Sequence, residues 1–168
     1  IVELPDDKDM IQHSTEILLD KLPIGNYLVM VSDNEKFSVD KKYTGYDLFT
    51  VTNISYVQRR KEDGSYDFYT LHRQTGAPLS NVSAQLWYSE YNYKTQHYEK
   101  KKGGEYLSNN DGYFTIPDQK NNYRNFFMTF RKDNDFLCSD ESYYFGYYNN
   151  KQPKNKFTYI FTDRAIYR

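Results

Sequence analysis

The stretch NVSAQLWYS, from Asn81 to Ser89, decides the fold class of this chain. Apolar side chains occupy every second position, and the positions between them are polar apart from one tryptophan. The first set is Val82, Ala84, Leu86 and Tyr88, and the second is Ser83, Gln85, Trp87 and Ser89. Because successive side chains of a strand point to opposite faces, this pattern predicts a strand that covers a core with one face.

The composition of the whole chain favours a protein built from strands. Among 168 residues there are 19 Tyr and 11 Phe, and aromatic residues make up 18% of the chain. Tyr, Phe and Thr suit the half-buried surface of a sheet, whereas the strong helix formers Ala and Leu are sparse. The balance of 22 Lys and Arg against 23 Asp and Glu excludes a basic field that would attract phosphate. We therefore expect an all-β protein without a nucleic-acid partner.

Turn signals divide the chain after Thr52 into short strands. The sequence EDGS places Asp63 and Gly64 between two alternating segments, which is the pattern of a tight hairpin. TGAP turns the chain again, and KKGG and NNDG, which end at Gly104 and Gly112, are expected to bracket a short strand. About eight strands are expected after Thr52, as in a fibronectin- or immunoglobulin-like β-sandwich of roughly 100 residues.

The first fifty or so residues hold too few strands for a second sandwich. We expect a strand between Asp9 and Leu22, and a tyrosine corner at Tyr27, where the ring packs over a turn and the hydroxyl bonds to backbone a few residues upstream. The alternating segment from 47 to 60 predicts one long strand that serves two domains. We place the boundary between these domains near Thr52.

No residues in the chain form a convincing catalytic or metal-binding pattern. Cys138, the single cysteine, is expected to be a buried structural thiol, and the three histidines lie far apart in the sequence. Three acidic sites are better explained as hairpin turns than as calcium ligands. They are Asp133 with Asp135, Asp140 with Glu141, and Asp111. We therefore expect a protein that is not an enzyme and has no catalytic, cofactor-binding or metal-ligating residues.

Tyrosines crowd two short segments of the chain. The first holds Trp87, Tyr88, Tyr91, Tyr93 and Tyr98, and the second holds Tyr143, Tyr144, Tyr147 and Tyr148. Since Trp87 and Tyr88 must face opposite ways, part of the first group lies outside the core. Packing against an adjoining domain is the favoured interpretation. A surface for a partner protein or a glycan is the alternative.

Four stretches together resemble the alpha-2-macroglobulin family, in particular its bacterial members. FTDRAIYR, Phe161 to Arg168, resembles the motif that opens a macroglobulin domain, and LFTVTNISYVQRR resembles the strand that enters the preceding one. FYTLHRQTGAPLSNVSAQLW is similar to the second strand, turn and third strand of that domain, and LPIGNYLVMVSD is similar to the end of an earlier domain.

The resemblance implies a fold of macroglobulin-type sandwiches in three segments. Residues 1–52 would be the C-terminal part of one sandwich, 53–155 a complete sandwich, and 156–168 the truncated first strand of a third. It implies a non-catalytic structural segment of a large protease-trapping inhibitor. Its partners would be the neighbouring macroglobulin domains of the same chain and, through the full-length parent, target proteases.

The resemblance also implies export to the periplasm or the cell surface, with any signal outside this segment. No apolar run reaches the ~18 residues that span a bilayer, so we expect no direct membrane insertion. Cys138 is followed by Ser139, Asp140 and Glu141, so the glutamine of the family's thioester is missing here. The alternative function is a carbohydrate- or protein-binding module, of carboxypeptidase-regulatory or transthyretin-like type, in a bacterial surface glycan system. A hydrolase that uses carboxylates is a weaker alternative.

Overall fold

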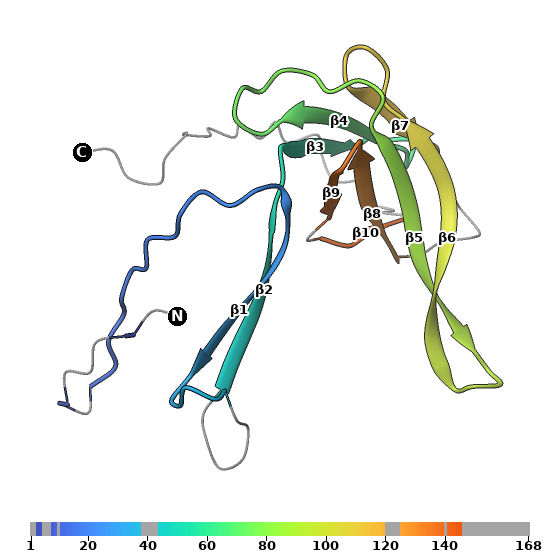
Figure 1. The fold of residues 1–168 in the computed structure, drawn as a ribbon. Coiled ribbons are helices and arrows are strands. Elements are labelled where there is room, and N and C mark those ends of the chain that lie inside the picture. The colour runs from blue at the N-terminus through green and yellow to red at the C-terminus, as the bar shows by residue number, and fades with distance from the viewer. Residues whose placement is uncertain are drawn as a thin grey trace, which may run out of the picture.

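The structure is a computed structural model that describes residues 3–4, 8–9, 11–37, 44–119, 125–139 and 141–145 (Figure 1). The described residues form strands and no helix, so the all-β prediction is confirmed. The strands are β1 (Gly25–Ser32), β2 (Thr44–Val51), β3 (Ile54–Arg60), β4 (Tyr66–His72), β5 (Ser83–Asn92), β6 (His97–Leu107), β7 (Tyr113–Ile116), β8 (Asn125–Lys132), β9 (Asp135–Cys138) and β10 (Tyr143–Tyr144).

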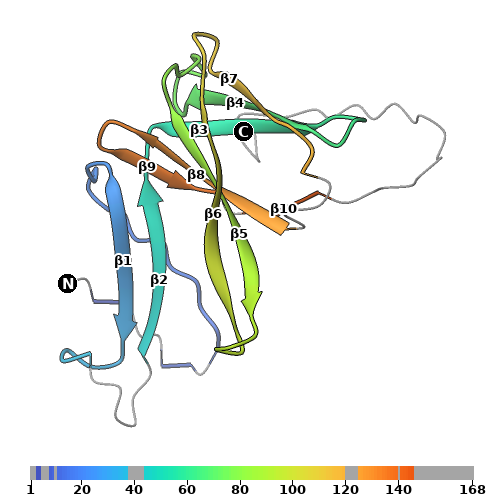
Figure 2. The same cartoon turned by 90° about the vertical axis from the view of Figure 1, so that its right-hand side faces the viewer.

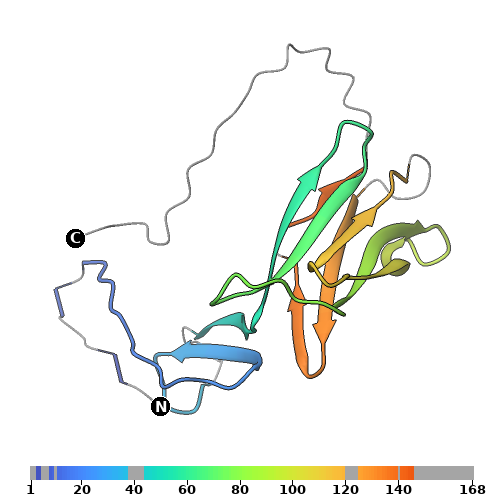
Figure 3. The same ribbon diagram turned by 90° about the horizontal axis from the view of Figure 1, so that it is seen from above.

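The strands that follow Thr52 form two antiparallel sheets that enclose a core. One sheet has the order β3-β4-β7, and the other has the order β10-β8-β5-β6, with β9 also paired to β8. Figure 3 shows the two sheets from above as two layers of one sandwich. Strands β1 and β2 pair only with each other among the described strands, and Figure 2 shows them as a separate ribbon beside the sandwich.

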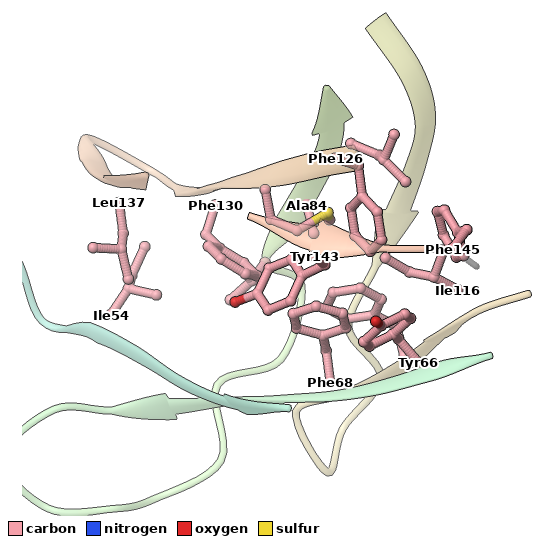
Figure 4. Packing of buried hydrophobic residues seen from close by; sticks show 14 residues of the cluster. Ile54, Tyr66, Phe68, Ala84, Ile116, Phe126, Phe130, Leu137, Tyr143 and Phe145 are labelled. Carbon is pink, nitrogen blue, oxygen red and sulfur yellow. The ribbon is translucent and has the colours of Figure 1, made fainter. Parts of the chain in front are cut away.

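The core between the two sheets is built mainly from aromatic rings (Figure 4). Phe68 of β4 stacks on Phe114 of β7, with ring centroids 5.2 Å apart and planes within 5°. Phe126 of β8 stacks on Phe145 at 4.3 Å. The alternation in the segment from Asn81 to Ser89 is confirmed, because Val82, Ala84 and Leu86 have no solvent exposure.

The turn at Asp63 and Gly64 joins β3 to β4 as predicted. Gly64 has φ of 87°, a left-handed conformation that glycine adopts without steric cost. The Asp63 carboxylate accepts a hydrogen bond from the backbone N–H of Ser65 at 2.9 Å. At the later TGAP turn, Gly76 has φ of 70° and its N–H donates to the carbonyl of His72 at 2.8 Å.

The prediction of a turn at Gly103 and Gly104 is wrong, because both glycines lie inside the long strand β6. The pairing of β5 with β6 shifts between Gln85 and Trp87, so the two glycines face the single residue Leu86 in a β-bulge. A Cβ at Gly103 would lie 2.5 Å from Cδ2 of Leu86. Glycine is therefore required here by a close approach within the core and not by a chain reversal.

The strand expected between Asp9 and Leu22 is also wrong. Residues 11–22 form no regular element, and most of their side chains are exposed. A strand needs a neighbour that accepts and donates its backbone hydrogen bonds, and no described strand pairs with this segment. Its alternation therefore has no sheet to join among the residues that the structure describes.

The segment from 47 to 60 is not one strand but parts of two. Strand β2 ends at Val51 and pairs with β1, whereas β3 begins at Ile54 and pairs with β4. The break at Thr52 and Asn53 lies where we placed a domain boundary, and the division into domains stays a prediction. The strand expected from Lys156 to Asp163, and the motif that ends at Arg168, lie outside the described residues.

Candidate functional site

The outer face of the sheet β3-β4-β7 is organised around one buried carboxylate, Asp67. Its neighbours Tyr66 and Phe68 belong to the buried core, and Asp67 itself is only 4% exposed. Burying a charge is costly unless it is paired and hydrogen-bonded. The contacts of Asp67 therefore decide its charge state.

Donors from two neighbouring strands, β3 and β7, and from the turn after β3 surround Asp67. The hydroxyl of Tyr113 donates to Oδ1 at 2.9 Å, and the hydroxyl of Thr115 donates to the same oxygen. The Lys61 Nζ lies 3.2 Å from Oδ1, and Nη2 of Arg59 lies 3.4 Å from Oδ2. The hydrogen bond from Thr115, aided by those from Tyr113 and Lys61, lowers the pKa of Asp67 from 3.8 to about 2. The carboxylate is thus ionised and its charge is neutralised by cations of the same face.

We predict that, because of this carboxylate, the free energy of unfolding of the chain decreases at acid pH. Its pKa is lower in the folded chain, so its contribution is present above pH ~4 and is lost as the pH falls towards 2. The difference from 3.8 to about 2 corresponds to roughly 2 kcal/mol. Urea unfolding at pH 6, 4 and 2.5 should show a smaller loss on acidification for Asp67→Asn than for the unchanged chain. An identical loss in both proteins would contradict the prediction.

The outer face of the larger sheet carries rings with cations above them. Trp87 of β5 and Phe127 of β8 are cross-strand neighbours on this face, with ring centroids 6.3 Å apart and planes within 10°. The Lys102 Nζ lies 5.6 Å from the Trp87 ring, and the Lys100 Nζ lies 5.2 Å from the Phe127 ring. We call this surface the basic aromatic face. It consists of Trp87, Lys100, Lys102, Phe127, Arg131 and Phe136, the last two forming a cation–π pair at 5.3 Å.

The hairpin β5–β6 extends beyond the sandwich (Figure 1). Its end carries a cluster of tyrosines. Tyr91 contacts Tyr93 and Tyr98 edge to face, each with centroids 5.1 Å apart. Tyr93 is 85% exposed and Tyr98 is 73% exposed. We call these three residues the tyrosine tip. Their low conformational freedom and large area suit a contact surface.

The alternation within the two tyrosine-rich segments is as expected. Trp87 points outward, while Tyr88 packs against the core. In the second segment Tyr143 is 5% exposed and Tyr144 is 45% exposed. Tyr147 and Tyr148 lie outside the described residues. Packing of the outward rings against an adjoining domain stays a prediction.

The hairpin β1–β2 contains the predicted tyrosine corner. The hydroxyl of Tyr27 donates to the carbonyl of Pro23 at 2.7 Å, four residues upstream, and the ring stacks on Phe49 with centroids 5.4 Å apart. The opposite face of the same hairpin is apolar and open. We call it the hairpin face, and it consists of Leu28, Met30, Tyr46 and Leu48, which are 54%, 44%, 75% and 69% exposed.

The prediction that Cys138 is buried is wrong. In β9 the side chain of Leu137 enters the core, so Cys138 points outward, opposite Thr129 of β8, and is exposed. Asp135 of the same strand is buried, and its Oδ2 accepts the backbone N–H of Asn53 at 2.8 Å. Asp135 therefore holds the backbone at Asn53. Of the predicted pair Asp133 and Asp135, only Asp133 lies in the turn.

The remaining acidic and histidine residues do not converge. Asp111 lies in the turn before β7, where its N–H donates to the side chain of Asn109 at 2.9 Å, and Asp140 lies outside the described residues. His13 bonds to Asp9 at 2.8 Å. Within the described ranges, no three residues of the His, Cys, Asp and Glu types gather as metal ligands would.

Sequence reasoning missed both outer-face clusters. Asp67 carried a signal, since an acidic residue between Tyr66 and Phe68 must point away from the core. The Asp63–Gly64 turn places Arg59 opposite it and brings the Lys61 side chain within reach. The basic aromatic face carried a weaker one, because its members come from four strands whose register the sequence does not state.

Among the residues that the structure describes, no helix has the length and apolar character needed to cross a bilayer. No protein-family model matches the chain, and no curated protein matches it. The chain is similar to two crystal structures of native alpha-2-macroglobulin from Escherichia coli, at 21% identity in both cases.

The first of these structures spans domains NIE-MG1; the match has a TM-score of 0.42 and covers 56% of this chain and 39% of that one. The second spans domains MG0-NIE-MG1; the match has a TM-score of 0.47 and covers 70% of this chain and 34% of that one. The chain thus spans well under half of either structure. Both belong to the family that the sequence motifs resemble.

Proposed function

We propose that this chain is a non-catalytic structural segment of a large alpha-2-macroglobulin-like protein, in which it holds neighbouring sandwich domains in position. The observation that carries the proposal is the open hairpin face, joined through Thr52 and Asn53 to the two-sheet sandwich. An isolated two-stranded hairpin is marginally stable in water. The apolar face of the hairpin β1–β2 is therefore expected to pack against further strands. The tyrosine corner in this hairpin indicates that those strands belong to a sandwich.

The connection between hairpin and sandwich is short and held by side chains. Nε of Arg73 donates to the carbonyl of Thr52 at 3.1 Å, and its Nη2 donates to the carbonyl of Ile54 at 3.1 Å. The buried carboxylate of Asp135 accepts the N–H of Asn53 at 2.8 Å. A connection of two residues fixed from both sides suits a scaffold that sets the direction from one domain to the next.

In this proposal residues 1–52, 53–155 and 156–168 belong to three successive macroglobulin domains. The parent protein is exported to the periplasm or the cell surface. Its other parts carry the protease-trapping chemistry, so the segment meets target proteases only as part of the parent. This chain contributes to inhibition by holding the neighbouring domains in their relative positions.

The scaffold role is tested by placing charge on the hairpin face. Leu28 and Leu48 lie opposite each other across the hairpin and are both exposed in this chain. Leu28→Glu with Leu48→Glu should leave the Tm of the 168-residue chain nearly unchanged. In the parent protein the same pair should lower the Tm of the adjoining domain by several degrees, because strands of that domain cover the hairpin face.

The matched control is Val57→Glu, which also places a charge at an exposed apolar site but on β3 of the two-sheet sandwich. It should act equally in the segment and in the parent. Equal effects of the leucine pair in both proteins would reject the scaffold proposal. The gene gives an independent test, since further sandwich repeats and a distant Cys-x-Glu-Gln are expected beyond Arg168, and a stop codon there would oppose the proposal.

The protease-trapping role of the parent needs its own assay. The parent is incubated with trypsin, and the hydrolysis of a small peptide is compared with that of a large protein substrate. Trapping should spare the peptide activity and suppress cleavage of the large substrate. Equal activity on both substrates would limit the proposal to a scaffold without inhibition.

A further inference from the structure

We propose that the basic aromatic face binds a linear acidic polysaccharide, such as a uronic-acid polymer. The proposal uses residues of β5, β6, β8 and β9 and is independent of the hairpin face. It would hold whether or not the parent traps proteases. Three features of the two outer faces support it: their unequal charges, the position of the rings, and the length of the surface.

The cations of the two outer faces differ in their partners. On the sheet β3-β4-β7, Arg59 and Lys61 lie against the buried Asp67, which offsets one of their two positive charges. On the larger sheet, Lys100, Lys102 and Arg131 lie over rings, and none has a carboxylate within ion-pair distance among the described residues. These three charges therefore remain available to an anionic ligand.

The acidic side chains near this surface do not cancel its charge. Glu105 shares the face, and its Oε1 accepts a hydrogen bond from the hydroxyl of Ser83 at 2.7 Å. Glu99 points to the opposite face, where it pairs with Lys101 at 2.8 Å. The described strands thus leave this face with an excess of positive charge, although the whole chain has a net charge of -1.

The rings and cations follow one line along the hairpin. Alternate residues of β5 and their partners in β6 share a face, so Trp87 with Lys102 is followed by Ser89 with Lys100 and then by Tyr91 with Tyr98. Such steps are about 7 Å apart along a strand. The surface therefore runs from Trp87 to the tyrosine tip as a narrow strip with rings at both ends and lysines beside them.

This strip fits an acidic polysaccharide better than a nucleic acid. Tight nucleic-acid binding neutralises about 6–10 phosphates, and three cations fall short of that number. Sugar rings present apolar C–H faces that pack on aromatic side chains, while their carboxylates are spaced widely enough to meet single lysines. The lysines are already held against Phe127 and Trp87, so little side-chain freedom is lost on binding.

Binding is measured by calorimetry and by the fluorescence of Trp87, the only tryptophan of the chain. Three polymers serve as probes: polygalacturonate, neutral dextran and polyglutamate. Polygalacturonate should bind and change the fluorescence, and its affinity should fall with rising salt. Dextran, which lacks charge, and polyglutamate, which lacks sugar rings, should each bind at least about tenfold more weakly, a difference of 1.4 kcal/mol.

Two variants locate the site. Lys100→Gln with Lys102→Gln should weaken polygalacturonate binding about fivefold, in keeping with two exposed ion pairs. Phe127→Leu should weaken it while keeping an apolar side chain over the sheet. Lys101→Gln is the matched control, because this lysine lies between the other two in sequence but faces the opposite side, and its substitution should leave the affinity unchanged.

Three results would overturn the proposal. Failure of polygalacturonate to bind would remove the site. Equal affinity for polyglutamate would show a simple charge patch without recognition of sugar. A loss with Lys101→Gln as large as that of the double variant would place the binding elsewhere on the chain.

Discussion

Replacement of Phe68 by alanine is expected to lower the free energy of unfolding by about 3–5 kcal/mol, which is close to the whole stability of many small domains. Phe68 lies at the centre of the sandwich and has no solvent exposure. Its ring stacks on Phe114 at 5.2 Å and meets the ring of Tyr143 edge to face at 5.5 Å. Alanine would remove both contacts and leave a cavity that rigid rings from two sheets cannot fill.

The neighbouring residue Tyr69 is the control for this prediction. It lies on the outer face of the same strand, is 41% exposed and packs on the Tyr113 ring at 5.1 Å. Tyr69→Ala should cost about 1 kcal/mol, as expected of a partly exposed aromatic pair. Urea unfolding followed by circular dichroism measures both variants. Similar losses for the two positions would mean that the core is not organised around Phe68.

The sequence predicted those parts of the fold that depend on local alternation and on turn residues. Val82, Ala84 and Leu86 alternate with polar neighbours, and the structure buries all three. Asp63 and Gly64 mark a hairpin because glycine accepts the left-handed backbone of Gly64, and because the Asp63 carboxylate accepts a backbone hydrogen bond from Ser65. Such signals are contained in a few adjacent residues, so they can be read without knowing the rest of the chain.

The errors arose where a distant strand decides the outcome. Gly103 and Gly104 look like a turn, but they form a bulge because Leu86 of the paired strand occupies the space beside them. Cys138 follows two apolar residues, yet the register of β9 on β8 turns it outward. The segment before Leu22 alternates without a partner strand among the described residues.

The candidate surfaces were harder to predict than the core for the same reason. A core residue needs only an apolar side chain on the inner face of its strand. The basic aromatic face requires Lys102, Trp87 and Phe127 to lie in one row across three strands. That row depends on the bulge at the two glycines, since removing one residue of β6 would turn the lysines to the opposite face.

Gly112 shows how a correctly predicted turn can conceal a larger constraint. The sequence NNDG indicated the turn, and Gly112 has φ of 71°. The structure adds that a Cβ at this position would lie 2.3 Å from the carbonyl oxygen of Thr70. The obstacle is backbone, so it cannot move aside as a flexible side chain would. The Gly112 carbonyl also accepts hydrogen bonds from the N–H and the hydroxyl of Thr70, at 2.8 and 3.0 Å.

Gly112→Ala is therefore expected to destabilise the chain by about 3 kcal/mol or more, through the left-handed backbone and the displacement of β4 from this turn. Gly76 separates these two causes, because it has φ of 70° but nothing within 4 Å of the added Cβ. Gly76→Ala should cost only about 1 kcal/mol, the conformational part alone. Urea unfolding of both variants gives the comparison. Equal losses would show that backbone conformation accounts for both. The chain would then relieve the close contact of the added Cβ with the Thr70 carbonyl without a further loss of stability.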